Sequence, residues 1–270
     1  MQQVNTQNFI GIKHNDTLDV PPDAKLFFVG DIHGHYDHLM KALHKADFDF
    51  DKDFLVSVGD LIDRGPNSAR VVMLIGERWF HPVMGNHDFF PVVDDYVNWM
   101  GNGGTWSLDY PDPDSNGFDP ILLRKLTSLP LTKTVTYGDL RFGVSHAGIP
   151  KFFKFWRDYA TQDYIDLPTD WDGIVQMLTE AVNDPLLHRE LVLTMLWDRT
   201  VRKGFDRGED FPKIAGVDYT IHGHTYSADR LNISNRVYLD TGCGWKDGNL
   251  TVTRANADGT FTDFLVPTKE

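Results

Sequence analysis

Five short segments of the sequence concentrate side chains that can bind a metal ion. Three lie early in the chain and read GDIHGH at 30–35, GDLIDRG at 59–65 and GNHD at 85–88. Two lie later, SHAG at 145–148 and HGHT at 222–225, and all five directly follow strand-like apolar runs. Carboxylate oxygens and imidazole nitrogens together suit Mn, Fe, Zn and similar divalent ions. We therefore expect five loops that converge on one metal site at the edge of a β core.

The spacing within the first two segments indicates how they would bind metal. Asp31 and His33 are two residues apart, so both side chains can reach one ion when the residue between them is turned away. Two metals roughly 3.5 to 4 Å apart need a bridging oxygen donor, because a shared carboxylate offsets the repulsion between the ions. Asp60 is the expected bridge.

The elements before these segments have an apolar pattern that alternates between strand and helix. The pattern predicts a strand at 25–29, a helix at 36–45, a strand at 54–58, a helix at 68–77 and a strand at 82–84. This alternation favours βαβ units and a parallel sheet. Parallel sheets hold ligand groups in the loops beyond the carboxyl ends of their strands, which is where the first three segments lie.

The second half of the chain has a different pattern. Short alternating runs predict a second, largely antiparallel sheet with strands at 132–137, 141–144, 219–221, 236–239 and 250–253. The expected fold class is therefore α/β, with two mixed β-sheets packed face to face as a sandwich and flanked by helices.

The remaining segments fit around these sheets. Residues 109–120, rich in Pro, Asp and Gly, are expected to form a loop, and 171–196 a helical stretch broken near Pro185. Residues 1–24 are polar and are expected to be a loosely held N-terminal leader. The rest, 25–270, is expected to be a single domain.

Composition narrows the classes of partner. A net charge of −13 argues against a broad basic surface for nucleic-acid backbone. Cys243 is the single cysteine, so no intrachain disulfide is possible, and with no signal-peptide pattern at the N-terminus this indicates the cytoplasm. No apolar run approaches the roughly 18 residues of a membrane span. The oligomeric state stays open.

The five segments, in this order, resemble the blocks GDxHG, GDxxDRG, GNH[ED], H and GH of the calcineurin-like metallophosphoesterases, in the phosphoprotein phosphatase branch. The resemblance spans about residues 25 to 250. It implies two divalent metal ions, with Mn expected and Fe, Zn, Ni or Co as alternatives. It makes Asp31, His33 and Asp60 the ligands of the first metal. The implied ligands of the second metal are Asp60, Asn86, His146 and His224.

The same resemblance implies roles for four further groups. Arg64 and Arg199 would bind the phosphoryl oxygens together with Asn86 and His87, since arginine forks match phosphate oxygens. His87 would act as the general acid toward the leaving oxygen, and Asp63 would orient it. Two simpler interpretations stay open: Asp63 and Arg64 as a structural ion pair, and Arg199 as a partner of a helix C-terminus.

The NGGTW sequence at 102–106 resembles an element of the bacterial and phage-type (lambda-like) serine/threonine protein phosphatases. The expected activity is hydrolysis of phosphate monoesters on Ser, Thr and also Tyr of a phosphoprotein or peptide, by direct attack of a metal-bound water or hydroxide. One alternative is a nucleotide hydrolase like the symmetric bis(5'-nucleosyl)-tetraphosphatases. The other is a non-catalytic scaffold.

The chain departs from the family pattern at two positions. Asp88 stands where Glu is commoner, and Tyr226 stands where members with a GHxH block carry a second histidine. The second departure leaves the first metal with fewer protein nitrogens. His222, two residues before His224, is expected to be a buried or supporting histidine rather than a ligand.

Overall fold

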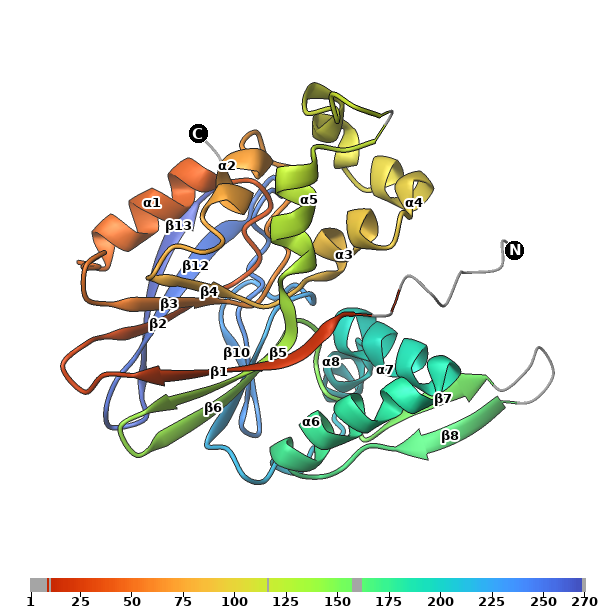
Figure 1. The fold of residues 1–270 in the computed structure, drawn as a ribbon. Coiled ribbons are helices and arrows are strands. Elements are labelled where there is room, and N and C mark those ends of the chain that lie inside the picture. Colours follow the sequence, from red (N-terminus) through yellow and green to blue (C-terminus); the bar gives the residue numbers. More distant parts are fainter. Residues whose placement is uncertain (1–8, 10, 116, 157–161, 269–270) are drawn as a thin grey trace.

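Two β-sheets pack face to face with helices on the outside (Figure 1), which confirms the predicted α/β sandwich. Apolar side chains from both sheets fill the space between them, including Phe28 and Val56 from one and Val135, Phe142 and Ile221 from the other. Burial of these faces stabilises the sandwich. The computed structural model describes residues 9, 11–115, 117–156 and 162–268.

The first sheet contains the predicted βαβ units. Strands β2, β3 and β4 run parallel, and helices α1 and α2 connect them. Parallel pairing brings the carboxyl ends of all three strands to one edge of the sheet. In spatial order the strands are β13 (Phe261–Pro267), β12 (Asn249–Ala255), β2 (Leu26–Val29), β3 (Phe54–Ser57) and β4 (Phe80–Pro82), and the helices are α1 (Tyr36–Lys45) and α2 (Ser68–Met73).

Two boundaries in this sheet differ from the prediction. Helix α2 ends at Met73 rather than at residue 77, because the chain then makes tight turns that end at Gly76, whose φ is +101°. Strand β4 ends at Pro82 rather than at residue 84. The amide of Met84 donates to the carbonyl of Pro130 (2.8 Å), so the chain has already turned toward the other sheet.

The second sheet is mixed, so the prediction of a largely antiparallel sheet was wrong. The β1/β5, β6/β9 and β9/β11 pairs are parallel, whereas β5/β6 and β10/β11 are antiparallel. Parallel pairing of β6 with β9 needs a long crossover, which the helices between them provide. The strand predicted at 250–253 is β12 of the first sheet. The spatial order is β1 (Lys13–Val20), β5 (Pro130–Tyr137), β6 (Leu140–Ser145), β9 (Tyr219–His222), β11 (Arg236–Tyr238) and β10 (Leu231–Ile233).

Strand β1 overturns part of the predicted leader at 1–24. Residues 13–20 pair in parallel with β5 along its whole length, and Phe9 packs at 2% exposure against Phe89. The segment is polar because it is an edge strand, where charged side chains are common. Lys133, on β5, donates to Asp16 (2.5 Å). Residues 1–8 and 10 lie outside the described part of the chain.

The helices and a hairpin fill the connections between strands. The predicted break near Pro185 is confirmed: Pro185 is the first residue of α7, and Asp184 caps it by accepting from the amides of Leu186 and Leu187. The elements are α3 (Asn86–Val92), α4 (Tyr96–Gly101), the 3-10 helix η2 (Gly104–Asp109), α5 (Pro120–Thr127), β7 (Phe152–Trp156), β8 (Gln162–Asp166), α6 (Trp171–Glu180), η3 (Ala181–Asn183), α7 (Pro185–Trp197) and α8 (Thr200–Asp206).

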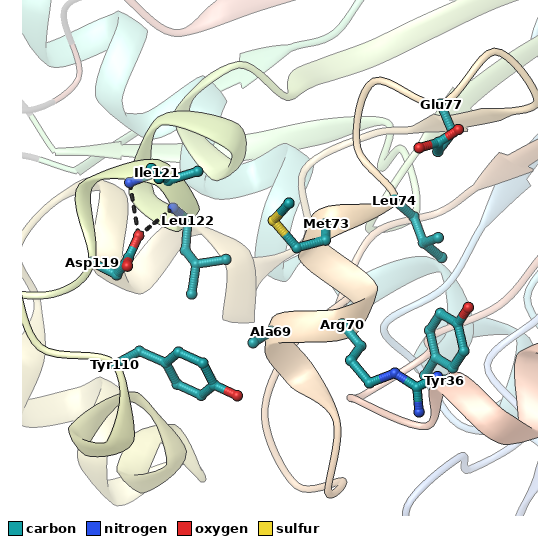
Figure 2. A pocket seen from close by; sticks show the side chains of 10 residues that line it. All are labelled: Tyr36, Ala69, Arg70, Met73, Leu74, Glu77, Tyr110, Asp119, Ile121 and Leu122. Carbon is teal, nitrogen blue, oxygen red and sulfur yellow. Dashed lines mark hydrogen bonds between the residues drawn. The ribbon is translucent and has the colours of Figure 1, made fainter.

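A groove of about 630 Å³ lies beside α2 and α5 (Figure 2). Met73 and Ile121 are half or more exposed at this groove, and Tyr110 forms part of its wall. Its lining, within the described chain, includes none of the predicted site residues. Within the described residues, the helices are all too short or too polar to span a membrane.

Candidate bimetal active site

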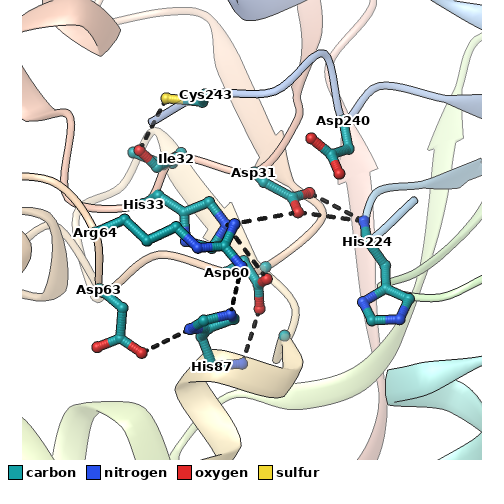
Figure 3. Close-up of polar contacts among 12 residues, drawn as sticks. Asp31, Ile32, His33, Asp60, Asp63, Arg64, His87, His224, Asp240 and Cys243 are labelled. Carbon is teal, nitrogen blue, oxygen red and sulfur yellow. Dashed lines mark hydrogen bonds and ion pairs between the residues drawn. The ribbon is translucent and has the colours of Figure 1, made fainter. Parts of the chain in front are cut away.

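The predicted loops meet at one place. Figure 3 shows side chains from the loops after β2 and β3 and from the start of α3 facing His224, which follows β9. The six predicted metal ligands are all 6% exposed or less, so water has little access to them. The structure therefore brings together Asp31, His33, Asp60, Asn86, His146 and His224.

The backbone of these loops is unusual. Among the described non-glycine residues, five predicted site residues have φ in the left-handed region: His33, Asp60, Asp63, Arg64 and His224. Such a conformation costs roughly 1–3 kcal/mol per residue and persists only where the surroundings hold it. Here the amides of Ile32 and His33 both donate to the carbonyl of Asp60 (3.0 and 2.8 Å), which fastens the first loop to the second.

The first group of donors surrounds His33. Its Nε2 lies 4.0 Å from Oδ2 of Asp31 and 3.6 Å from Oδ2 of Asp60. Its Nδ1 donates to the carbonyl of Ile62 (3.0 Å), so in the neutral ring Nε2 carries a lone pair. Burial, followed by the charge of Arg64, lowers the pKa of His33 and keeps the ring neutral, although Asp60 opposes this.

The second group surrounds Asn86. Its Oδ1 lies 2.9 Å from Nε2 of His146 and 2.8 Å from Nδ1 of His224. Nε2 of His146 also lies 3.3 Å from Oδ1 of Asp60. Asp60 thus contacts His33 through one oxygen and His146 through the other, so this carboxylate lies between the two donor groups and would be able to bridge two ions.

The chemistry of this second group fits a cation. His146 donates from Nδ1 to the carbonyl of Val58 (2.8 Å), and burial lowers its pKa, so its Nε2 is a bare lone pair. That lone pair faces two oxygens, Oδ1 of Asn86 and Oδ1 of Asp60, which are acceptors as well. No proton lies between Nε2 of His146 and either of these oxygens, so the three acceptors repel one another, and a cation among them would relieve that repulsion.

The electrostatics of the carboxylates lead to the same conclusion. Burial, then the neighbouring charges of Asp240 and Asp60, raises the pKa of Asp31 well above its ordinary value. For Asp60 burial acts in the same direction, but His146, His87 and His33 together lower its pKa. Buried carboxylates this close to one another are stabilised as anions by a shared positive charge, which divalent ions supply.

The predicted acid lies beside these donors. Nδ1 of His87 donates to Oδ2 of Asp63 (2.6 Å), and its backbone amide donates to Oδ1 of Asp60 (2.9 Å). Arg64 donates from Nη1 to Nε2 of His33 (2.6 Å) and from Nη2 to Nε2 of His87 (2.9 Å). Asp63 and Arg64 therefore contact different partners, and the simpler interpretation of an ion pair between them was wrong.

Arg199 contacts the second donor group. It follows the C-terminus of α7, and its Nε donates to Nε2 of His224 (3.1 Å). Its side chain therefore reaches the ligand group instead of only the end of the helix. Burial, then the neighbouring His146 and Arg199, lowers the pKa of His224 to about 2, so this ring is neutral.

Asp88, one of the two departures from the family pattern, and the histidine at 222 both have structural explanations. Asp88 is fully buried and accepts from the amides of Leu61 and Gly85 (both 2.9 Å), so it joins the second and third loops without the extra methylene of Glu. His222 is fully buried and bonds Ser145 and Thr220, which agrees with a supporting role.

Sequence reasoning missed three groups around the site. Asp240 lies two residues after the end of β11, as Asp31 lies two residues after β2, and burial raises its pKa to about 6. Trp245 lies with its ring 5.7 Å from the guanidinium of Arg64. Trp99 and Trp106 bond Asp63. The position after a strand could have identified Asp240, and the NGGTW sequence at 102–106 marks Trp106 without indicating its partner, whereas Trp99 and Trp245 carry no local signal.

Residues 24–228 match the family described as calcineurin-like phosphoesterase. The chain belongs to this family. The match covers the loops that carry the candidate ligands, and the predicted resemblance to this family is confirmed. The chain is a metallophosphoesterase, a hydrolase of a family that uses divalent metals, and its buried donor groups are candidate ligands for them.

Curated relatives carry two kinds of name. The chain is 32% identical over 222 residues to "Serine/threonine-protein phosphatase 2" of Escherichia coli (strain K12), covering 80% of this chain and 87% of the relative. It is 34% identical over 280 residues to the symmetrical bis(5'-nucleosyl)-tetraphosphatase of Photorhabdus laumondii, covering 89% and 97%. A solved protein serine/threonine phosphatase of Saccharomyces cerevisiae shares the fold, with TM-score 0.59, 14% identity and coverage of 98% and 87%.

Proposed function

We propose that this enzyme is a protein serine/threonine phosphatase that hydrolyses phosphate monoesters. The observation that carries the proposal is the bond between His87 and Asp63 (2.6 Å) beside the two donor groups. The leaving group of a phosphoserine or phosphothreonine is an alkoxide, which needs a proton as the ester bond breaks. The relative in Escherichia coli, named a serine/threonine-protein phosphatase, supports the same substrate class.

The donor groups would hold two divalent metals, for which we propose Mn. Asp31, His33 and Asp60 would bind the first, and Asn86, His146 and His224 would bind the second together with Asp60. When bound, the metals would supply an activated water and positive charge next to the phosphoryl group. The choice of Mn rests on the mixed oxygen and nitrogen donors, which Fe, Zn, Ni and Co also accept.

The remaining site residues bind substrate and move a proton. Arg64 and Arg199 flank the donor groups and would each bind phosphoryl oxygens, with Asn86 beside them. His87 would donate from Nε2 to the leaving oxygen, because its Nδ1 is already engaged by Asp63. Asp63 would then stabilise the positive charge on the ring before the proton leaves.

A second candidate function is hydrolysis of a dinucleoside tetraphosphate. The observation that favours it is Trp245, whose side chain is 61% exposed and whose ring lies 5.7 Å from the guanidinium of Arg64. An exposed indole beside a phosphate-binding arginine offers a surface on which a nucleobase can stack. The relative in Photorhabdus laumondii bears the name of such a hydrolase.

A side-by-side assay separates the two functions. Metal-stripped protein, with and without added Mn, is given p-nitrophenyl phosphate, a phosphoserine peptide and a dinucleoside tetraphosphate. Metal-restored release of phosphate from the peptide supports the phosphatase, and selective cleavage of the dinucleotide favours the alternative. Trp245→Ala should weaken cleavage of the dinucleotide only. No detectable activity on any of the three substrates despite bound metal would favour the non-catalytic scaffold.

A further inference from the structure

Trp99 and Trp106 both donate hydrogen bonds to Asp63, the carboxylate that contacts the proposed acid His87. Nε1 of Trp99 donates to Oδ1 of Asp63 (2.9 Å), and Nε1 of Trp106 donates to the same oxygen (2.8 Å). The other oxygen, Oδ2, accepts from Nδ1 of His87 (2.6 Å). Asp63 is fully buried, so these three donors satisfy a charge that has no access to water.

The chain around the two indoles is shaped to reach Asp63. Gly103 has φ of +107°, and a Cβ there would lie 3.0 Å from the amide nitrogen of Arg64. A Cβ on Gly104 would lie 2.6 Å from the ring of Trp99. The two glycines therefore let η2 approach both the second loop and the first indole, which explains the NGG sequence by packing.

The indoles are fixed by aromatic neighbours. Trp99 and Trp106 meet edge to face with centroids 6.1 Å apart, and both contact Phe118 at 5.1 and 5.5 Å. Trp106 also contacts Tyr110, on the wall of the groove in Figure 2, at 5.8 Å. A packed cluster of this kind leaves the two N–H groups little freedom to turn away from Asp63.

We propose that Trp99 and Trp106 are positioning residues that act through Asp63 on His87, an inference that rests on the proposed role of His87 as the acid. An indole nitrogen can only donate, so two of them on Oδ1 leave Oδ2 as the oxygen that His87 meets. The carboxylate cannot rotate without breaking both bonds. The ring of His87 is thereby held in one orientation, with Nδ1 toward Asp63 and Nε2 on the side of Arg64, where the phosphoryl group would bind.

The test uses two aryl phosphates whose leaving groups differ in basicity. Phenyl phosphate needs the acid, whereas p-nitrophenyl phosphate has a better leaving group and depends on it less. Trp106→Phe keeps the ring and removes the N–H. We expect kcat on phenyl phosphate to fall about tenfold, which is within the range for groups that orient a residue in contact with the substrate. We expect kcat on p-nitrophenyl phosphate to fall by clearly less.

Trp171→Phe is the matched control. Trp171 is also fully buried and also donates its N–H, to Oγ1 of Thr134 (2.8 Å), but it is the first residue of α6 and packs against the second sheet. It should lower the melting temperature without changing the ratio of the two rates. Trp99→Phe should resemble Trp106→Phe; where its buried ring proves essential for folding, Trp106→Phe alone carries the test.

A double-substitution cycle decides between positioning and mere packing. In a His87→Ala background, Trp106→Phe should change neither rate, because the residue through which it acts is gone. Equal slowing on both aryl phosphates, or an undiminished effect without His87, would overturn the inference. Failure of wild-type enzyme on the phosphoserine peptide would instead overturn the proposed function, since the aryl phosphate ratio does not depend on the natural substrate.

Discussion

The two sheets contribute different parts of the candidate site. The loops of the first sheet supply the proposed bridging carboxylate, the proposed acid and its partner, through Asp60, His87 and Asp63. The loops of the second sheet supply the imidazoles of the second proposed ligand group, His146 and His224. We infer that the first sheet sets the chemistry and the second mainly completes binding. Substitutions in the first sheet should therefore lower kcat most, and substitutions in the second sheet should mainly weaken binding.

The backbone shows the same difference. Of the left-handed site residues, His33, Asp60, Asp63 and Arg64 lie in loops of the first sheet, and only His224 lies in the second. The strained loops are fastened to each other by backbone hydrogen bonds, such as that from Gly34 to Leu61 (2.8 Å). Strain of this kind concentrates where geometry must be exact for function, which places the more sensitive half of the site in the first sheet.

The largest effect should come from Asp60→Asn, which removes the charge shared by both donor groups. We expect kcat to fall by about 10³-fold or more, because both metals lose their common ligand. Steady-state kinetics and metal analysis measure the loss. Asp53→Asn is the matched control: it is the same change at the other end of β3, where the carboxylate accepts from the amides of Lys25 and Asp49. Turnover by Asp60→Asn above roughly a tenth of wild type would contradict the bridge.

The next largest effect is expected from His87→Ala, which tests whether the first sheet supplies the group that protonates the leaving oxygen. His87→Ala should retain its metals and slow phenyl phosphate hydrolysis about 10²- to 10³-fold, with a smaller loss on p-nitrophenyl phosphate. The reason is that the better leaving group departs without a proton. Metal content by mass spectrometry and the two rates are the measurements. Equal losses on both substrates would count against His87 as the acid.

A smaller effect on the kinetic constants is expected when either of the two arginines is substituted. Arg64 contacts His33 and His87, whereas Arg199 contacts His224. We expect Arg199→Ala to raise KM about tenfold with a modest change in kcat, and Arg64→Ala to lower kcat as well. Initial rates over a range of p-nitrophenyl phosphate concentrations distinguish the two. The same pattern from both variants would remove the proposed difference between the sheets.

The smallest effect should appear in stability alone. Burial raises the pKa of Asp16, but hydrogen bonds from Lys13 and Lys133 outweigh it and lower the pKa to about 2. The folded pKa lies below the ordinary value of 3.8, so the contribution is full above pH 4 and is lost as the pH falls toward 2. Chemical denaturation at several pH values should show this loss in wild type and less of it in Asp16→Asn. Activity near neutral pH should be unchanged.

The sequence by itself determined the local parts of this protein. Strand-like runs followed by GDIHGH, GDLIDRG and GNHD predicted parallel strands with ligands beyond their carboxyl ends, and β2, β3 and α1 lie where predicted. These signals are readable because strand alternation, helix periodicity and turn-forming glycine act over a few residues. Strand-like runs before SHAG and HGHT also marked His146 and His224, and the family resemblance added their assignment to the second metal.

Only the tertiary structure decided which distant segments meet. The pairing of β1 with β5, the place of β12 in the first sheet and the approach of Trp99 and Trp106 to Asp63 all depend on contacts between residues far apart in the chain. Strand β1 was misread because an edge strand is polar, which in sequence resembles a loose leader. An indole that will donate to a buried carboxylate looks, in sequence, like any other aromatic core residue, because its partner is chosen by packing and not by spacing.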